Sequence, residues 1–341
     1  MERVFCIAAG QITTKKSNHV IHRRNQYLNY GLLSLASALK RSGIDAIQFQ
    51  GNFDTPTTTL DTALESGILE STYPVLISIP SFYAISWVNE FISLLKEASP
   101  SIKVIIGGRW VIDGQFEHMR GLVPLADEIV HGTAEHLIRG IVEQDKKTKS
   151  LSFVSSSNSL DYTLLHQREL YQPSIEISRG CGMGCSFCQE KSEPLSSLKH
   201  PNDILEEASS SQLIDDHQPM NFYLEASMFV PNRNWVGMFT SSINTIAVPN
   251  FHWRTEARVD SLYPSFLEPL YRCGLRVIDL GLESADYAQL IRMSKTKDPV
   301  RYLRKASALV KRRTGSESKL KLTFCFSREK QLVQSTQLKN G

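Results

Sequence analysis

The strongest constraint on the fold is an alternation of short apolar stretches with amphipathic ones, which fills the first half of the chain and then starts again. One helical pattern, residues 30–43, is an apolar stripe that ends on a glycine. Strands that are apolar on both faces and alternate with helices predict a parallel sheet covered on both sides. We therefore expect a flavodoxin-like, doubly wound α/β domain over residues 1–145. Its strands are expected at residues 3–9, 45–50, 75–79, 103–108 and 127–132.

The same alternation returns after a polar, serine-rich stretch, residues 145–161. Turn-forming residues without periodicity favour a domain boundary, so we expect a linker over residues 146–173. Five further strand–helix repeats indicate a partial β/α barrel over residues 174–326, and a polar tail over 327–341 follows it. The barrel strands are expected at residues 174–178, 221–227, 251–259, 276–284 and 319–326.

Charge and hydropathy exclude several classes of partner. Lys and Arg number 38 against 35 Asp and Glu, a net charge of +3, so no polyanion-binding surface is implied. The basic stretch 303–313 reads as the solvated face of a helix, and we expect no nucleic-acid binding. No apolar run approaches the roughly 18–20 residues of a membrane span, and the N-terminus is too polar for a secretory signal. We expect a cytoplasmic protein without a membrane partner, in which clustered cysteines are metal ligands or catalytic groups.

Three of the six cysteines, Cys181, Cys185 and Cys188, follow the expected strand 174–178 directly. Three thiolates on one loop can hold three irons of a cubane cluster and leave the fourth iron open. A structural zinc ion takes four ligands, usually in paired units, and the nearest other cysteines, Cys273 and Cys325, are distant in the sequence. The spacing favours an iron–sulfur cluster with one open iron. A zinc site, or three incidental cysteines, is the alternative.

The segment "CGMGCSFC", led by "SRG", resembles the cluster motif of the radical S-adenosylmethionine (SAM) enzymes. In that family, SAM chelates the open iron, and an electron from the cluster cleaves SAM to methionine and a 5′-deoxyadenosyl radical. The resemblance implies a [4Fe-4S] cluster on the three cysteines, SAM as a second cofactor, and an external electron donor.

The same resemblance implies weaker positions for SAM. Phe187 would pack beside the adenine. Glu225, in "FYLEAS", would face the amino end of SAM, and Arg258, in "RTEARVD", would contact its carboxylate or ribose. Glu283 and Ser284, in "LGLESA", would contact the ribose. The alternative for each is a strand-end residue or a member of a surface ion pair.

A doubly wound domain in front of such a barrel resembles the cobalamin (B12)-binding subgroup of the family. The markers are Ser78, in "SIP", and the pair Gly107 and Gly108, where bare backbone would let a nucleotide tail approach. The Asp-x-His-x-x-Gly motif that usually supplies a cobalt ligand is absent, and His19 and His22 are the histidines that would approach instead. The alternative is ordinary strand-end chemistry in a domain that has lost its cofactor.

The resemblance implies a radical SAM enzyme, with cobalamin-dependent methylation of an unactivated carbon in a peptide or small metabolite as the expected reaction. A cobalamin-independent cyclisation, oxidation or rearrangement is the first alternative. Relatives usually have six barrel strands, whereas only 15 residues follow the fifth strand here. An open sheet edge invites pairing. We therefore also expect either a partner that covers this edge or a truncated, non-catalytic binding subunit.

Overall fold

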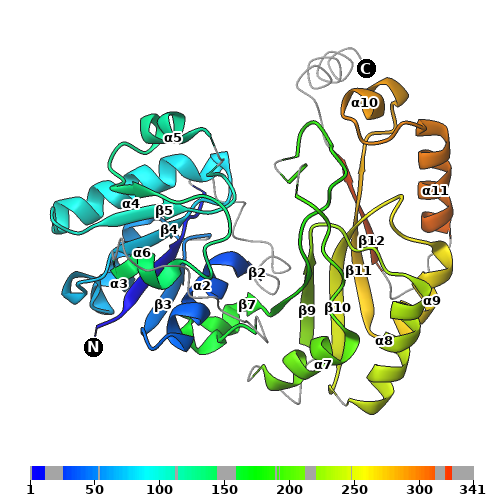
Figure 1. Cartoon of the computed structure of the whole chain (residues 1–341), viewed down its shortest axis with the longest axis horizontal. Helices are drawn as coiled ribbons and strands as arrows, with labels where there is room; N and C mark the ends of the chain where they lie inside the picture. Colours follow the sequence, from blue (N-terminus) through cyan, green and yellow to red (C-terminus); the bar gives the residue numbers. More distant parts are fainter. Residues whose placement is uncertain are drawn as a thin grey trace, which may run out of the picture. The chain divides into compact units, whose positions relative to one another are not determined.

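The computed structural model divides the chain into two compact units, Met1–Gln172 and Pro173–Gly341, each treated separately below (Figure 1). In the described part of the chain, no helix is long and apolar enough to cross a membrane. The structure describes residues 2–11, 26–52, 54–111, 114–143, 159–188, 190–191, 193–211, 220–246, 248–311 and 319–324.

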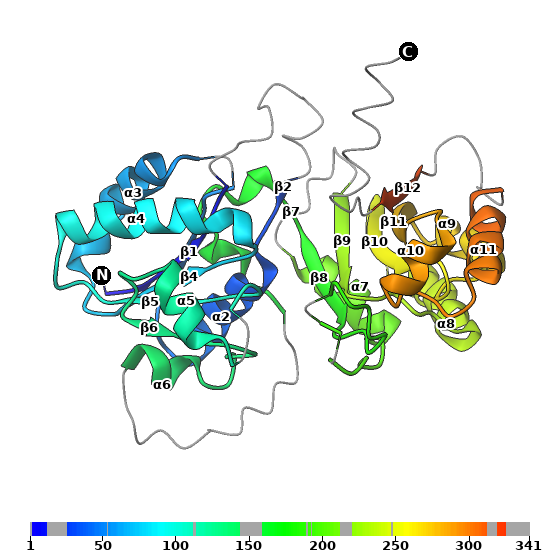
Figure 2. The same ribbon diagram turned by 90° about the horizontal axis from the view of Figure 1, so that it is seen from above.

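Unit 1 is built on a parallel sheet in the order β3-β1-β4-β5-β6. This is the flavodoxin-like order, so the expected doubly wound fold is confirmed. Helices α3 and α4 lie on one face of the sheet, and α2 and α6 lie on the other (Figure 2). The strands are β1 (Val4–Ala8), β3 (Ala46–Gln50), β4 (Val75–Ser78), β5 (Val104–Gly107) and β6 (Glu128–Ile129). The helices are α2 (Tyr30–Arg41), α3 (Pro56–Glu65), α4 (Ile85–Ala98), α5 (Phe116–Leu122) and α6 (Ile138–Glu143), with 3₁₀ turns η1 (Ile68–Glu70) and η2 (Phe82–Ala84).

The core of unit 1 lies between the sheet and α4. Trp87, Phe91 and Leu95, spaced four residues apart on α4, are fully buried. The rings of Trp87 and Phe91 stack with centroids 5.2 Å apart. Burying each such side chain contributes about 1.5–3 kcal/mol, which fixes the helix on the sheet.

The segment 159–172 corrects the expected linker. It forms η3 (Tyr162–Leu164), η4 (Arg168–Leu170) and β7 (Tyr171–Gln172), and β7 pairs with β2 (Gln26–Tyr27). The backbone N–H of His166 donates to the carbonyl of Gln48 across 2.9 Å. Leu164 and Leu165 are buried, because the segment carries an apolar pattern that the serine-rich stretch before it lacks. This half of the linker is part of unit 1, and residues 144–158 lie outside the described residues.

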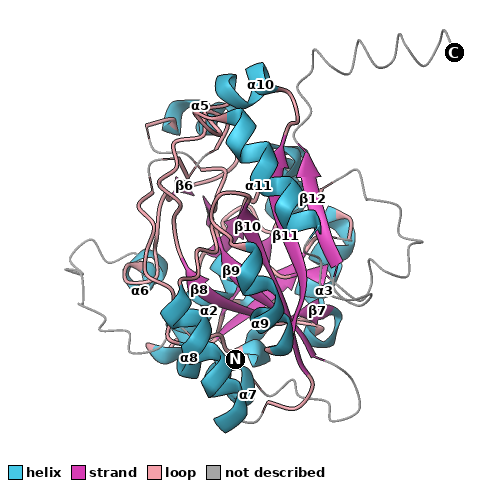
Figure 3. Ribbon diagram, turned by 90° about the vertical axis from the view of Figure 1, so that its right-hand side faces the viewer, coloured by secondary structure: helices cyan, strands magenta, loops and turns pink. Residues whose placement is uncertain are grey.

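Unit 2 is a second parallel sheet, in the uninterrupted chain order β12-β11-β10-β9-β8. This confirms the expected partial barrel, while the polar tail 327–341 lies outside the described residues. Helices α8, α9 and α11 lie on one face of the sheet (Figure 3). The strands are β8 (Ser174–Ser178), β9 (Met220–Ala226), β10 (Phe251–Arg258), β11 (Leu275–Glu283) and β12 (Lys319–Phe324). The helical segments are α7 (Pro201–Ser210), α8 (Arg233–Thr245), η5 (Pro264–Phe266), α9 (Leu267–Arg272), α10 (Tyr287–Arg292) and α11 (Pro299–Lys311).

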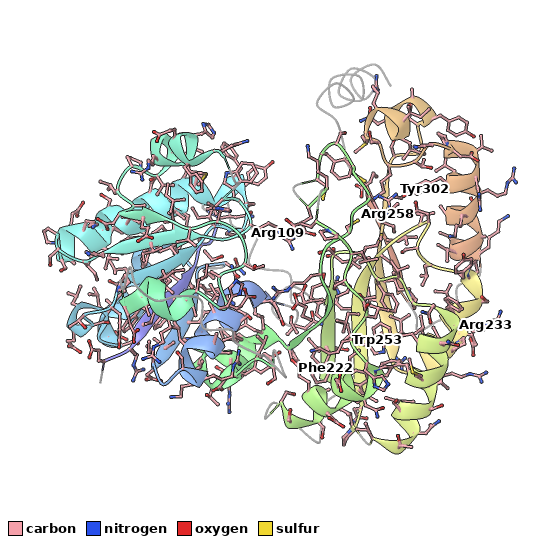
Figure 4. The ribbon with its side chains drawn as sticks, viewed as in Figure 1. Arg109, Phe222, Arg233, Trp253, Arg258 and Tyr302 are labelled. Carbon is pink, nitrogen blue, oxygen red and sulfur yellow. The ribbon has the colours of Figure 1, made fainter. Side chains whose placement is uncertain are left out.

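The two faces of this sheet differ in chemistry. Phe222 and Trp253 belong to the core shared with the helices. Because side chains alternate along a strand, the opposite face carries polar residues, among them Arg254 and Arg258. Figure 4 shows Arg258 and Tyr302 toward the carboxyl end of the strands and Phe222 and Trp253 toward the other end. The cysteines follow β8 at the carboxyl end of the sheet. They therefore lie near the polar residues at that end, such as Arg258.

Candidate functional site

The cysteine loop, residues 179–193, follows β8, and its first residues have a backbone conformation that requires glycine. A Cβ atom on Gly180, whose φ is +70°, would lie 2.2 Å from the carbonyl oxygen of Pro194. The backbone N–H of Cys181 donates to the carbonyl of Glu193 across 3.0 Å and closes the loop. These contacts fix the first residues of the loop against residues 193–194. Positive φ angles recur at Gly180, Gly182 and Gly184.

The three thiols differ in exposure. Cys185 is buried, whereas Cys181 and Cys188 are partly exposed. Burial raises the pKa of the Cys181 thiol, a cost that metal binding would have to meet because the thiolate is the ligand. Within the described residues, no three His, Cys, Asp or Glu side chains come together as ligands of a single metal ion. Three thiols on one loop are a donor set that fits a cubane cluster with one open corner.

Arg258, at the end of β10, lies against the cysteine loop. Its Nη1 donates to the Sγ of Cys185 across 3.0 Å. Its Nε and Nη2 each donate to the carboxylate of Asp260 across 2.9 Å, and Nη2 also donates to the carbonyl of Lys295 across 2.6 Å. Burial opposes the charge, but the hydrogen bonds and charge of Asp260 raise the pKa of Arg258. All three guanidinium nitrogens have partners, so in this structure Arg258 braces the loop against β10.

Lys295 contacts two residues, Glu283 and Phe187, that the sequence analysis predicted as separate SAM contacts. Its Nζ lies 3.1 Å from Oε1 of Glu283 and 6.0 Å from the ring centroid of Phe187. Lys295 is 5% exposed, whereas Phe187 is 47% exposed. The structure therefore brings Phe187, Glu283, Arg258 and Cys185 into one neighbourhood, with Lys295 between them.

Lys295 does not stand out in the sequence, because it lies inside residues 287–313, which carry a helical pattern of apolar residues. The structure ends α10 at Arg292 and starts α11 at Pro299, and Lys295 lies in the turn between them. The proline and the polar residues before it were the signal for this break. The turn also holds the cysteine loop, since the N–H of Ser186 donates to the carbonyl of Met293 across 3.0 Å.

Glu283 has an unusual backbone conformation. Its φ is +67°, the left-handed region that few residues other than glycine adopt. A Cβ on Gly281, two residues earlier, would lie 2.9 Å from Oε1 of Glu283 and 3.3 Å from Nζ of Lys295. Glycine there leaves room for the ion pair. The neighbouring Ser284 is buried, and its Oγ accepts a hydrogen bond from the N–H of Asp286 across 3.1 Å.

Glu225 lies on β9, partly buried and in register with Glu176 of β8. Side chains alternate along the strand, so Glu225 stands on the polar face, away from Leu224 and the helix-side core. Its position is compatible with the expected contact to the amino end of SAM, which stays a prediction.

In unit 1, Ser78 and Gly107 are paired in register at the carboxyl ends of β4 and β5. Gly108 has a φ of +100°, and a Cβ there would lie 2.6 Å from Oγ of Ser78 and 2.7 Å from the backbone nitrogen of Ile79. The Oγ of Ser78 accepts a hydrogen bond from Nδ2 of Asn29, the N-cap of α2, across 2.9 Å. Glycine at 108 therefore lets the backbone pack closely against the end of β4. Gly107 and Gly108 also leave this edge without side chains, which is compatible with the expected approach of a nucleotide tail.

This edge also has the topology expected of a binding site. The strand order reverses between β1 and β4, and open α/β sheets bind ligands outside the carboxyl ends at such a switch point. His19 and His22 lie outside the described residues.

No protein-family model matches the chain, and no curated protein matches it by sequence. Solved structures do match it. The cobalamin-dependent SAM radical enzyme OxsB, with aqua-cobalamin and SAM bound, gives a TM-score of 0.63 at 16% identity, covering 95% of this chain and 49% of OxsB. The chain has the fold of the cobalamin-dependent radical SAM enzymes.

A second match agrees with the first. The radical SAM methyltransferase TsrM from Kitasatospora setae, with its tryptophan substrate and the SAM analogue aza-SAM, gives a TM-score of 0.67 at 14% identity, covering 94% of this chain and 67% of TsrM. TsrM with cobalamin and a [4Fe-4S] cluster bound gives 0.65, also at 14% identity, over 95% of this chain and 69% of TsrM. The chain spans about half the length of OxsB.

These structures confirm, at the level of the fold, the resemblance to radical SAM enzymes with a cobalamin-type front domain. OxsB and TsrM bind, between them, cobalamin, SAM and a [4Fe-4S] cluster. In this chain, the loop of Cys181, Cys185 and Cys188 follows β8, the first strand of unit 2, directly.

Proposed function

We propose that this protein is a radical SAM enzyme, in which Cys181, Cys185 and Cys188 hold a [4Fe-4S] cluster. The observation that carries the proposal is the position of the three-cysteine loop, directly after the first strand of a radical SAM fold and beside the buried guanidinium of Arg258. When bound, the cluster would supply the electron, taken from an external donor, that cleaves SAM to a 5′-deoxyadenosyl radical.

The residues around the loop have chemistry that suits SAM. The half-exposed ring of Phe187 offers a flat apolar face for the adenine. The carboxylate of Glu283 is held by Lys295, and a fixed carboxylate accepts hydrogen bonds from the hydroxyls of a ribose. Ser284 adds a hydroxyl next to it, and Glu225 is a carboxylate acceptor for the amino group. These roles follow from donor and acceptor chemistry, and each is open to substitution.

We further propose that unit 1 binds cobalamin through the edge formed by Ser78, Gly107 and Gly108. The supporting observations are the fixed hydroxyl, the missing side chains and the position at the switch point of the sheet. With cobalamin, the reaction would be methylation of an unactivated carbon in a peptide or a small metabolite. We place the protein in the cytoplasm, where the thiols of a cluster site stay reduced.

One feature favours a second candidate function. The Asp-x-His-x-x-Gly motif is absent from the whole sequence. If unit 1 carries no cobalamin, the same radical would serve a cyclisation, an oxidation or a rearrangement. Retention of cobalamin by the purified full chain separates the two candidates.

The test is anaerobic reconstitution of the full chain with iron and sulfide, followed by SAM and dithionite, with 5′-deoxyadenosine as the product measured. We expect turnover in the wild type and in Cys273→Ala, whose thiol is buried elsewhere in unit 2. Turnover should be lost in each of Cys181→Ala, Cys185→Ala and Cys188→Ala. A protein that assembles no cluster would contradict the proposal.

A further inference from the structure

Four positions form a row across the carboxyl end of the unit 1 sheet. Ala8 of β1 is in register with Gln50 of β3 on one side and with Ser78 of β4 on the other, and Ser78 is in register with Gly107 of β5. Their strand neighbours toward the other face belong to the core shared with α3 and α4: Ile7, Phe49, Ile77 and Ile106. Since side chains alternate, the row belongs to the opposite face, where α2 lies (Figure 2).

The row holds only polar or small residues, although it lies in a buried part of the sheet. Gln50 is 5% exposed, and among the described residues neither Nε2 nor Oε1 of its carboxamide has a hydrogen-bond partner. Gln48, two residues earlier on the same face, donates through Nε2 to the carbonyl of Asn29 across 3.4 Å, so among the described residues only its Oε1 lacks a partner. A buried amide with both atoms unsatisfied costs folding free energy, and such a group needs a reason in function. Gln50 is therefore the residue of the row whose unsatisfied polar atoms a ligand would satisfy.

The small residues in and beside the row indicate where that ligand would bind. Ala8 is small, Gly107 has no side chain, and Gly108 leaves its backbone exposed beyond Ser78. The row crosses β1 and β4, the pair at which the strand order reverses. A carboxamide offers a donor and an acceptor side by side. A complementary ligand would carry amides, or a similar mixture of hydrogen-bond donors and acceptors, at its periphery.

From this row we infer that Gln50 is a ligand-binding residue of unit 1, and that its carboxamide hydrogen-bonds to the peripheral polar groups of cobalamin. The inference rests on the proposed function, in which this edge of unit 1 binds cobalamin. Cobalamin fits the chemistry because its corrin ring carries several carboxamide side chains, which can donate to Oε1 and accept from Nε2.

The substitution Gln50→Met should have different effects if Gln50 binds a ligand and if it only packs in the core. Methionine has a similar length and no group that needs a hydrogen bond. The substitution removes two unsatisfied atoms, so it should raise the thermal midpoint of the cobalamin-free protein. It should also weaken cobalamin binding, because the ligand's own polar groups lose their partner. A purely structural glutamine would not combine higher stability with lower affinity.

Thr59→Val is the matched control. Thr59 lies on α3, over the other face of the sheet, is 3% exposed, and its Oγ1 likewise has no partner among the described residues. This variant also removes an unsatisfied buried atom, but it does so away from the row. It should raise the thermal midpoint and leave cobalamin affinity unchanged.

The experiment uses the full chain, with hydroxocobalamin and dicyanocobinamide as probes. Cobinamide keeps the corrin carboxamides and lacks the nucleotide. Affinities come from equilibrium dialysis followed by absorption, and thermal midpoints from circular dichroism without ligand. We expect Gln50→Met to bind hydroxocobalamin roughly tenfold or more weakly than the wild type, about the effect of one or two hydrogen bonds. A parallel loss for cobinamide places Gln50 on the corrin, and an unchanged cobinamide affinity places it on the nucleotide.

The failures of the two proposals can be told apart. Wild-type binding with equal affinity in Gln50→Met overturns the inference and leaves cobalamin binding by unit 1 standing. A lower thermal midpoint in Gln50→Met also overturns it, because the glutamine then has a structural role. A wild type that binds neither probe refutes cobalamin binding and the inference together, while 5′-deoxyadenosine formation still tests the radical chemistry of unit 2.

Discussion

The Nη1 of Arg258 lies 3.0 Å from the Sγ of Cys185, and both side chains are buried. The two residues are 73 positions apart in the sequence, yet the ends of β8 and β10 bring them together. Asp260 and the carbonyl of Lys295 fix the guanidinium from its other side. A cationic donor is thereby held against a thiol that we propose as a ligand of the cluster.

This contact predicts an effect on the electron affinity of the cluster. Hydrogen bonds to the cluster sulfurs are among the factors that set its reduction potential. Arg258→Lys keeps the charge but loses the planar fork that contacts Cys185 and Asp260 together. We expect the reconstituted cluster of this variant to have a lower reduction potential, measured by a redox titration followed by electron paramagnetic resonance.

Arg272→Lys is the control for that titration. Arg272 is an exposed residue of α9 that pairs with Glu268 on the same helix. The Arg272→Lys variant should leave the reduction potential of the cluster unchanged. An unaltered potential in Arg258→Lys, with the cluster fully assembled, would refute the role of the hydrogen bond.

Asp260 predicts a dependence of stability on pH. Burial alone would raise the pKa of this carboxyl, but the hydrogen bonds and charge of Arg258 outweigh it and lower the pKa. A lowered folded pKa gives stability that is present above the unfolded pKa of about 3.9 and is lost as the pH falls through the folded value. Asp260→Asn should therefore destabilise the protein by about 1–2 kcal/mol at pH 7, with a difference that shrinks below about pH 4.

The measurement is urea unfolding of the wild type and the variant over a series of pH values. Glu206→Gln, on the exposed side of α7, gives the background effect of removing a carboxylate. A wild-type advantage over Asp260→Asn that stays constant from pH 7 to pH 3 would contradict the lowered pKa.

The limits of the sequence are clearest at these contacts. The fold was predictable because alternating apolar patterns report which faces are buried, and the spacing of Cys181, Cys185 and Cys188 is local. The contact of Arg258 with Cys185, and that of Lys295 with Glu283, depend on which strand ends are neighbours and on a turn inside an apparently continuous helix. No local pattern encodes those distances.

The boundaries failed for a related reason. Polar composition predicted a linker from residue 146, but it did not indicate that residues 159–172 belong to unit 1. Gln50 escaped notice because it lies in an otherwise ordinary strand pattern, and only the register of three strands places it next to Ala8 and in one row with Ser78.

The cysteines predict a pattern of chemical reactivity. Cys6 is fully buried, and burial raises the pKa of its thiol to about 12, so almost none of it is thiolate at pH 8. In cluster-free protein, we expect an alkylating reagent to modify Cys181 and Cys188 and to leave Cys6 and Cys273 unmodified until the protein unfolds. Peptide mass spectrometry gives the extent of modification at each site. Reconstitution with iron and sulfide should protect the loop cysteines, whereas labelling of Cys6 as fast as Cys188 would contradict the packing of β1.

Gly108 predicts the effect of a single methyl group on unit 1. Gly108→Ala would place a Cβ 2.6 Å from Oγ of Ser78 and 2.7 Å from the nitrogen of Ile79, on a backbone with φ of +100°. Gly132 also has a positive φ, +76°, but no atom lies within 4 Å of its hypothetical Cβ. Gly132→Ala should cost about 1–2 kcal/mol through backbone strain alone. Gly108→Ala should cost more than this in urea unfolding, because the clash adds to the strain.

The same pair of variants separates stability from binding. If the bare backbone of Gly108 admits the nucleotide tail, Gly108→Ala should lose affinity for hydroxocobalamin and keep much more of its affinity for cobinamide, which has no tail. Gly132→Ala should bind both as the wild type does. Equal losses for both ligands in Gly108→Ala would mean that the methyl group disturbs the whole edge of the sheet, and the tail would then have to lie elsewhere than against Gly108.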